Sequence, residues 1–302
     1  MAYTGTGSQT DPFVVDNYAD LKTCCAKSSQ DASASNDVYI KLKDNCVIDC
    51  NTMGDSWEWT TIELALVGYG KVDIDLNGGT IKNALIAKDN YMFYTPTSRA
   101  LYIHNSKKTG GIFNIFCNEA NSVFNASYEK YITIENVSMS FNITSLKYYL
   151  FAKTRLRKCA VYVVANKIND SVYYQTASDI TALDNCDFYF DIKDMNGHRL
   201  FQSNGSSLHT GCRVQGTIAG NLDTYWLLEG NFSNSVINID NTKTLNYSGK
   251  SMDFGSSSGI VNKDICKVAS ASMYGSLIQV TSEEIVSYDA LSSKGFPVVK
   301  VG

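Results

Sequence analysis

The sequence is poor in charged residues and in proline, and it contains no long hydrophobic run. Charged residues make up 19% of the 302 positions, and the net charge of −4 disfavours an electrostatic nucleic-acid-binding protein. Three prolines exclude a proline-rich chain. No apolar segment approaches the roughly 20 residues that a membrane-spanning helix needs. Because the start, MAYTGTGS, has neither a basic region nor an apolar core, we expect no signal peptide and synthesis in a cytosol.

What the sequence does contain is enough apolar material for a large core, since hydrophobic residues make up 44% of it. Helical periodicity is confined to Tyr18–Ala26, which follows the capping residues Asp16 and Asn17. From Val38 onward, short segments alternate between apolar and polar residues, as in Val72, Ile74 and Leu76. The pattern therefore predicts an all-β chain.

A loose internal repeat runs through the β region. Its unit reads apolar, any residue, Asn, two residues, apolar, and the anchor position recurs every 22 to 28 residues, at Asn136, Lys158, Asn185, Gly211, Asn234 and Asn262. Such a period suits one coil of about three short strands, and coils of this kind must stack to bury their inner faces. We therefore predict a right-handed, single-stranded parallel β-helix over residues 38–280. Residues 1–37 would form an N-terminal strand and capping helix, and 281–302 a C-terminal cap or docking segment. A β-sandwich also has strands at short intervals, but it does not explain the anchor spacing.

The anchors Asn136, Asn185, Gly211, Asn234 and Asn262 are expected to form a structural ladder at one corner of the coils. Asn and Gly both tolerate the positive φ of a sharp corner, and stacked Asn side chains can bond to one another. Cysteines follow three anchors directly and are expected to stack inside the helix: Cys159, Cys186 and Cys212.

Cysteine and histidine do not form a metal-binding pattern. The spacing of Cys46 and Cys50 would suit a pair of zinc ligands, but no second pair matches it, and the histidines are scattered. The nine cysteines are an odd number, which favours free thiols. We expect no metal and no cofactor.

Three kinds of side chain are candidates for function. Paired carboxylates suited to glycoside hydrolysis occur at Asp73 with Asp75, Asp187 with Asp191, and Asp223 with Glu229, although outward positions of any coil are polar. The basic run from Lys153 to Lys158 could meet an acidic neighbour or nucleic acid, but a solvated strand edge explains it better. The candidate surface contacts, for sugar or protein, are aromatic: Trp57, Trp59, Tyr148, Tyr149, Tyr173 and Tyr174.

Two segments resemble those of phage proteins. Residues 5–21, GTGSQTDPFVVDNYADL, resemble the opening of many β-helical proteins of bacteria and their phages, and residues 288–298, YDALSSKGFPV, resemble a segment of phage virion proteins. The resemblance implies a non-enzymatic structural component of a virion, of the tailspike, fibre or appendage type. It would be a homotrimer that contacts other virion proteins and a host surface glycan, without nucleic acid or membrane. The alternatives are a polysaccharide-cleaving tailspike depolymerase and a bacterial surface adhesin, the latter weakened by the missing signal peptide.

Overall fold

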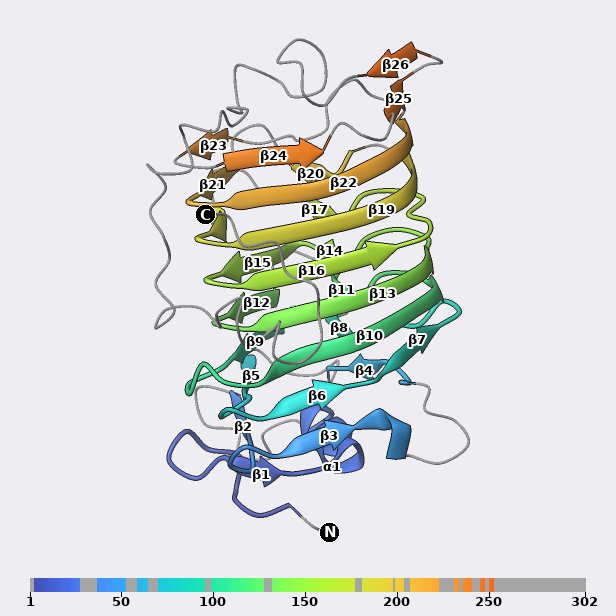
Figure 1. Ribbon diagram of the computed structural model, residues 1–302. Coiled ribbons are helices and arrows are strands. Elements are labelled where there is room, and N and C mark those ends of the chain that lie inside the picture. Colours follow the sequence, from blue (N-terminus) through green and yellow to red (C-terminus); the bar gives the residue numbers. More distant parts are fainter. Residues whose placement is uncertain are drawn as a thin grey trace.

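The chain folds into a parallel β-solenoid, in which three sheets run along the stacked coils (Figure 1). The computed structural model describes residues 3–27, 37–52, 59–64, 70–95, 99–127, 132–176, 181–197, 199–203 and 207–222, and the strands at 231–233, 236–240, 245–247 and 250–252. The predicted β-helix is confirmed for these residues. The predicted boundary at residue 280 and the segment 281–302 lie outside them.

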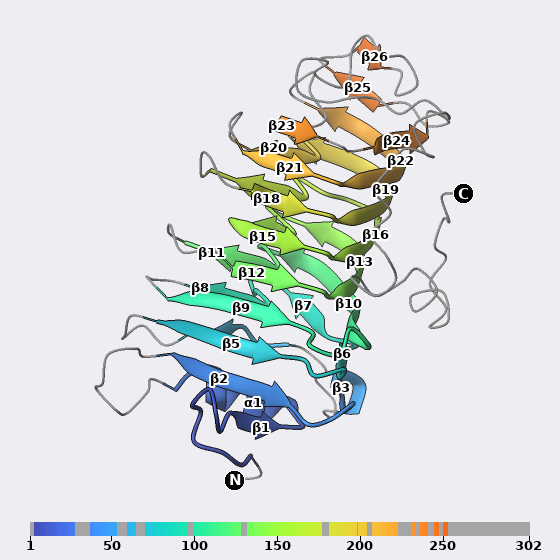
Figure 2. The ribbon, with the colours of Figure 1, turned by 90° about the vertical axis from the view of Figure 1, so that its left-hand side faces the viewer.

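Sheet A has nine strands in the order β1 (Phe13–Val15), β2 (Val38–Leu42), β5 (Lys71–Asp75), β9 (Ala100–His104), β12 (Ile132–Glu135), β15 (Thr154–Arg157), β18 (Thr181–Asp184), β21 (Leu208–Thr210) and β23 (Asn231–Ser233). Figure 2 looks onto this sheet. Each strand pairs in parallel with the strand of the next coil, so that corresponding positions stack in columns.

Sheet B contains the longest strands, in the order β26 (Lys250–Met252), β25 (Leu245–Tyr247), β22 (Arg213–Leu222), β19 (Asp187–Gly197), β16 (Ala160–Ala165), β13 (Ser138–Leu146), β10 (Gly111–Ala120), β6 (Thr80–Lys82) and β3 (Val47–Asp49). Beside this path, β24 (Val236–Asp240) pairs with β22, and β7 (Leu85–Ala87) pairs with β10. The pairing of β25 with β26 is antiparallel. A short 3-10 helix, η1 (Cys50–Thr52), follows β3.

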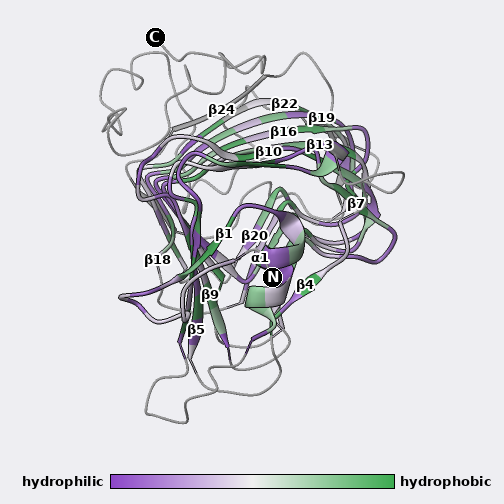
Figure 3. Cartoon of the chain, turned by 90° about the horizontal axis from the view of Figure 1, so that it is seen from below, coloured by the Kyte–Doolittle hydropathy of each residue, from purple (hydrophilic) through white to green (hydrophobic). Residues whose placement is uncertain are grey.

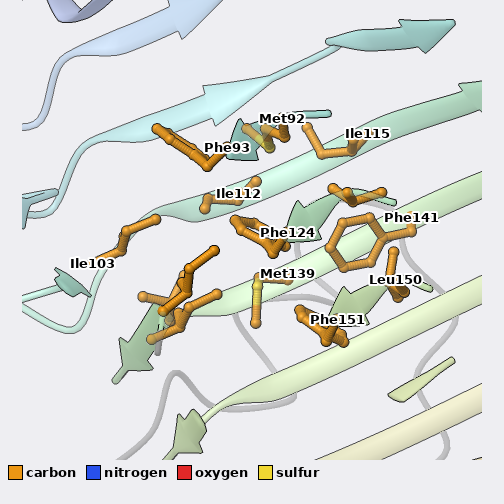
Figure 4. Packing of buried hydrophobic residues seen from close by; sticks show 14 of the residues in the cluster. Met92, Phe93, Ile103, Ile112, Ile115, Phe124, Met139, Phe141, Leu150 and Phe151 are labelled. Atoms are coloured by element: carbon orange, nitrogen blue, oxygen red, sulfur yellow. The ribbon is translucent and has the colours of Figure 1, made fainter. Parts of the chain in front are cut away.

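Sheet C closes the third side of each coil with short strands, in the order β20 (Phe201–Ser203), β17 (Tyr173–Gln175), β14 (Phe151–Ala152), β11 (Phe124–Ala126), β8 (Phe93–Thr95) and β4 (Ile62–Glu63). Its inward positions carry an aromatic ladder, because Phe93, Phe124, Phe151, Tyr173 and Phe201 occupy one register column. All five side chains are fully buried, and Figure 4 shows three of them, Phe93, Phe124 and Phe151. Burial of one such side chain contributes roughly 1.5–3 kcal/mol, so this column is a main source of cohesion between coils.

The one α-helix of the described residues, α1 (Tyr18–Cys25), lies across the N-terminal end of the solenoid (Figure 3). Asn17 begins it: its side-chain oxygen accepts a hydrogen bond from the backbone N–H of Asp20 at 2.9 Å. The buried side chains of the helix are those of Leu21, Cys24 and Cys25. The helix thus covers the open end of the first coils, as the sequence predicts.

The corner between sheets A and B is made by residues with positive φ. Asn136, Lys158, Asn185 and Gly211 each follow a strand of sheet A and have φ between 51° and 63°. A Cβ atom at Gly211 would lie 2.2 Å from Oδ1 of Asn185, so any other residue here would have to displace that side chain. The expected side-chain bonds between successive anchors do not form here, since Lys158 and Gly211 interrupt the series and Asn185 donates to Asp184 Oδ1 at 3.0 Å. Asn234 and Asn262 lie outside the described residues.

Buried cysteines follow these corners in three successive coils. The thiol of Cys159 donates to the carbonyl of Arg157 at 3.3 Å, and Cys186 and Cys212 donate likewise to Asp184 and Thr210. Burial raises the pKa of the Cys186 thiol well above its ordinary value. Through these hydrogen bonds the thiols tie each corner to the strand before it. The eight described cysteines are all free, and Cys266 lies outside the described residues.

Candidate functional site on the outer face of sheet A

The outward face of sheet A carries two columns of polar side chains, because alternate residues of a strand point outward and the strands stack in register. One column contains Tyr39, Asp73, Tyr102, Thr133 and Arg155. The second contains Lys41, Asp75, His104, Glu135, Arg157 and Asp184. We distinguish an acidic part around Asp73 and Asp75 on β5 from a basic part around Arg155 and Arg157 on β15, which is flanked by Glu135 on β12 and Asp184 on β18.

The acidic part is the Asp73 cluster, which we define as Lys71, Asp73, Asp75 and His104. Asp73 is 8% exposed, and its two carboxylate oxygens have different partners. Oδ2 lies 2.8 Å from Lys71 Nζ, and Oδ1 lies 2.9 Å from Nε2 of His104. The other ring nitrogen of His104 lies 3.8 Å from Asp75 Oδ1. The imidazole is therefore hydrogen-bonded to Asp73 and lies near Asp75 without a hydrogen bond to it.

The partners of Asp73 hold it in the ionised form. Burial by itself raises the pKa of Asp73, but hydrogen bonds and charges from His104 and Lys71 outweigh burial, so that the pKa lies below its ordinary value. A glycoside hydrolase needs one carboxyl group that is still protonated at working pH. Asp73 does not meet that requirement, and its Oδ1 is already hydrogen-bonded to His104.

Tyr102 connects the acidic and basic parts. Its ring stacks on His104 with centroids 4.7 Å apart, and its hydroxyl donates to Glu135 Oε2 at 2.7 Å. Burial, together with the hydrogen bond to Glu135, raises the pKa of Tyr102 well above its ordinary value. The phenol thus remains a proton donor at neutral pH, and one oxygen of Glu135 is committed to it.

The basic part is a surface pocket of about 330 Å³ lined by Thr133, Arg155, Arg157 and Thr181, which we call the arginine pocket. Arg155 and Arg157 lie two positions apart on β15 and so share one face, about 6.6 Å from Cα to Cα. The prediction that the Lys153–Lys158 run is a strand edge is wrong, because β15 pairs with β12 on one side and β18 on the other. The positive charges therefore stand in the middle of a sheet.

The remaining carboxylate pairs do not make a site. Asp187 is 2% exposed and accepts a bidentate pair of hydrogen bonds from the guanidinium of Arg213. Asp191 lies four residues further along the same strand, about 13 Å away, which exceeds the separation that either glycosidase geometry uses. Asp223 and Glu229 lie outside the described residues.

The prediction of aromatic surface contacts is wrong for Trp59 and Tyr173, which are fully buried. Trp59 packs between Tyr18 and Phe93 and donates its indole N–H to the carbonyl of Met92 at 2.9 Å. Tyr173 belongs to the inner ladder of sheet C and donates to the carbonyl of Thr154 at 2.7 Å. Each ring instead satisfies its polar atom inside the core.

Of the other tyrosines, Tyr148 and Tyr149 lie between β13 and β14, and Tyr174 lies in β17. Tyr148 is 51% exposed, whereas Tyr149 and Tyr174 stack on each other with centroids 4.4 Å apart and nearly parallel planes. Because each of these two rings covers a face of the other, the pair mainly joins two coils. Trp57 lies outside the described residues.

His104, Tyr102 and Glu135 did not emerge from the sequence as functional candidates, although the corner anchors point to them. His104, Glu135, Arg157 and Asp184 each stand directly before Asn105, Asn136, Lys158 or Asn185, the residues at their corners. In a stacked coil, residues at the same offset from the corner form one column. Aligning the coils on their corners would therefore have placed these four side chains side by side.

Within the described ranges, no group of three or more His, Cys, Asp or Glu side chains is placed to hold a metal ion. None of the helices among those same residues has the length and apolarity for crossing a membrane.

No protein-family model matches the chain, and no curated protein matches its sequence. Among solved structures, a putative immunoglobulin A1 protease from Bacteroides ovatus is similar, with a TM-score of 0.52 and 12% sequence identity. The similarity covers 90% of this chain and 88% of that chain. The chain is a parallel β-solenoid. At such low identity the likeness concerns the fold alone, so the function has to be argued from the outer face of sheet A.

Proposed function

We propose that the protein is a non-enzymatic binding component of a phage particle, a β-solenoid appendage that contributes to host attachment. Stacked coils make a stiff rod, because each coil is fixed by its neighbours through continuous backbone pairing and an inner apolar ladder. A rod of this kind holds a binding face away from the particle. The likeness of residues 5–21 and 288–298 to segments of phage virion proteins supports the assignment to a particle.

The observation that carries the non-enzymatic role is the state of the carboxylates. Asp73 is bonded to Lys71 and His104, and Asp187 to Arg213. These carboxylates are neutralised by neighbours within the chain, so neither is placed to donate a proton to a glycosidic oxygen. A binding face whose acids stabilise the sheet fits attachment better than hydrolysis.

Two assays test this proposal. Antibody against the protein should label purified phage particles, and incubation of the protein with the host's capsule or wall glycans should release no new reducing ends. If reducing ends appear and Asp73→Asn abolishes their release, while Lys41→Gln does not, the protein is an enzyme.

One specific observation keeps polysaccharide cleavage as the second candidate. A carboxylate hydrogen-bonded to an imidazole, as Asp73 is to His104, is also the arrangement by which a histidine is oriented as a general base. The reducing-end assay decides between the two candidates directly.

Homotrimerisation belongs to the same proposal and rests on the likeness to phage spikes and fibres. Light scattering should give three times the chain mass of 33.3 kDa. A stable monomer at micromolar concentration would contradict it.

A further inference from the structure

We infer that the arginine pocket binds the carboxylate of an acidic sugar, such as a uronic or sialic acid unit of a surface glycan. The inference rests on the proposed attachment function, since it names the class of ligand that the outer face of sheet A would take. It starts from the pocket formed by Thr133, Arg155, Arg157 and Thr181 between β12, β15 and β18.

The strand that lines this pocket, β15, carries several positive charges. Arg155 and Arg157 keep their charge at any physiological pH. Lys153 and Lys158 stand at the two ends of the same strand, so one coil carries four cations in six residues on a chain with a net charge of −4. Glu135 on β12 and Asp184 on β18 flank this strand, so the excess of positive charge is confined to one coil, where it can attract an anion to one place.

The guanidinium of Arg157 is exposed and only loosely paired. Its side chain is 52% exposed, and its Nε lies 3.8 Å from Asp184 Oδ2, which is too long for a hydrogen bond. Its other acidic neighbour in the column, Glu135, accepts the hydroxyl of Tyr102. The guanidinium therefore faces solvent with donors to offer, in contrast to Arg213, which is bound bidentately to Asp187.

The groups that line the pocket suit a ligand with a planar carboxylate and hydroxyl groups. A guanidinium binds a planar carboxylate through two parallel N–H donors. The ammonium group of a lysine is a point charge and cannot offer this geometry. The hydroxyls of Thr133 and Thr181 line the same pocket, and hydroxyl groups exchange hydrogen bonds with the hydroxyls of a sugar. A volume of about 330 Å³ is at the small end of the range for ligand pockets. The pocket can therefore hold one sugar unit but is too small for a nucleic-acid duplex.

An acidic sugar explains these features better than nucleic acid does. Binding to a phosphate backbone draws on many lysines and arginines spread over a surface, and an acidic chain repels such a polymer at long range. Here the cations are confined to one coil, and the acidic Asp73 cluster lies on the neighbouring strands of the same sheet.

The test is a calorimetric titration of the full chain with two probes, a galacturonic acid trisaccharide and sialyllactose, each compared with its methyl ester. The ester keeps the sugar and removes the charge. We expect at least one acid to bind, its ester to bind about tenfold more weakly or worse, and its affinity to fall as salt is raised.

Variants locate the binding. Arg157→Gln should weaken it about tenfold, and Arg157→Lys should also weaken it because the planar fork is lost. Lys41→Gln removes a positive charge from the same column of sheet A, three strands away from β12, and should leave the affinity within about twofold. Arg155→Gln serves as a second pocket variant, with its unfolding transition measured to show that it folds.

The inference is wrong if neither acid binds, if the esters bind as well as the acids, or if Lys41→Gln weakens binding as much as Arg157→Gln. It is also wrong if a single-stranded oligonucleotide binds this pocket more tightly than either acid. Mass spectrometry of the recovered sugar separates this inference from the proposed function: a cleaved sugar contradicts the non-enzymatic role, whereas an intact sugar that does not bind contradicts the carboxylate site.

Discussion

Two regions of one sheet face, the Asp73 cluster and the arginine pocket, differ in how their charges are used. In the Asp73 cluster, the buried carboxylate of Asp73 has a cation or an imidazole against each of its oxygens. In the arginine pocket, Arg157 is half exposed and has only a loose ion pair with Asp184. The backbone is the same repeated strand in both places, so the difference comes from the side chains alone.

On this solenoid, the charged residues that stabilise the fold differ from those that are open to a ligand. A charge that is buried and paired contributes to folding and has little left to offer a ligand, whereas a charge at the surface contributes almost nothing to folding and stays open to binding. Each coil can therefore be assigned to one role or the other by the partners of its outward side chains.

The largest effect is expected where pairing is most complete, at Arg213 and Asp187. Arg213→Met leaves the buried Asp187 carboxylate without its cation and should lower the free energy of unfolding by about 3–5 kcal/mol, measured by denaturant unfolding. The double variant Asp187→Leu with Arg213→Met removes both charges and should lose less. A single variant as stable as the wild type would show that paired charges do not support the fold.

Asp73→Asn should have the next largest effect on the free energy of unfolding. It weakens the contacts with Lys71 and His104 and should cost about 1.5–3 kcal/mol, because hydrogen bonds to charged groups are the stronger kind. Asp75→Asn is the matched control: Asp75 lies further from His104 and keeps an amide oxygen that accepts from the backbone of Asn77, so the loss should be smaller. Equal losses would remove the special position of Asp73.

The pH dependence should follow Asp73 in sign. Its pKa is lower in the folded chain than in the unfolded one, so the unfolded chain binds more protons in acid. The stabilisation is complete above the unfolded value near pH 3.9 and is lost as the pH falls through the folded pKa. The difference in stability between wild type and Asp73→Asn should therefore shrink below about pH 4. A difference that does not change with pH would mean that Asp73 is not ionised.

The smallest effect on folding is expected in the arginine pocket. Arg157→Gln should change the free energy of unfolding by less than about 0.5 kcal/mol, since its ion pair is exposed and long. Thermal unfolding of this variant beside wild type measures it. A large loss would mean that Arg157 supports the sheet, as Asp73 does.

The sequence was sufficient for the fold because its corner residues repeat. Asn136, Asn185 and Gly211 mark positions that need positive φ, and the alternation before them fixes which side chains point inward. The capping helix was also readable, from Asn17 and the apolar residues after it.

The site was harder to predict because its contacts join residues about 30 positions apart. The sequence pairs Asp73 with Asp75, but nothing near them in the sequence indicates that His104 is hydrogen-bonded to Asp73. The burial of Tyr173 and Trp59 was also hard to predict: Tyr173 lies in a strand of three residues, too short for its alternation to show which face is inside, and Trp59 lies before β4, outside any strand.

The most direct test of the account is one titration of an acidic trisaccharide into two variants, Asp73→Asn and Arg157→Gln. Asp73→Asn should bind with an affinity within about twofold of the wild type despite its lower stability, and Arg157→Gln should bind about tenfold more weakly despite its intact stability. If Asp73→Asn loses as much affinity as Arg157→Gln while still folded, the two regions form a single site and the separation of stability from binding is wrong.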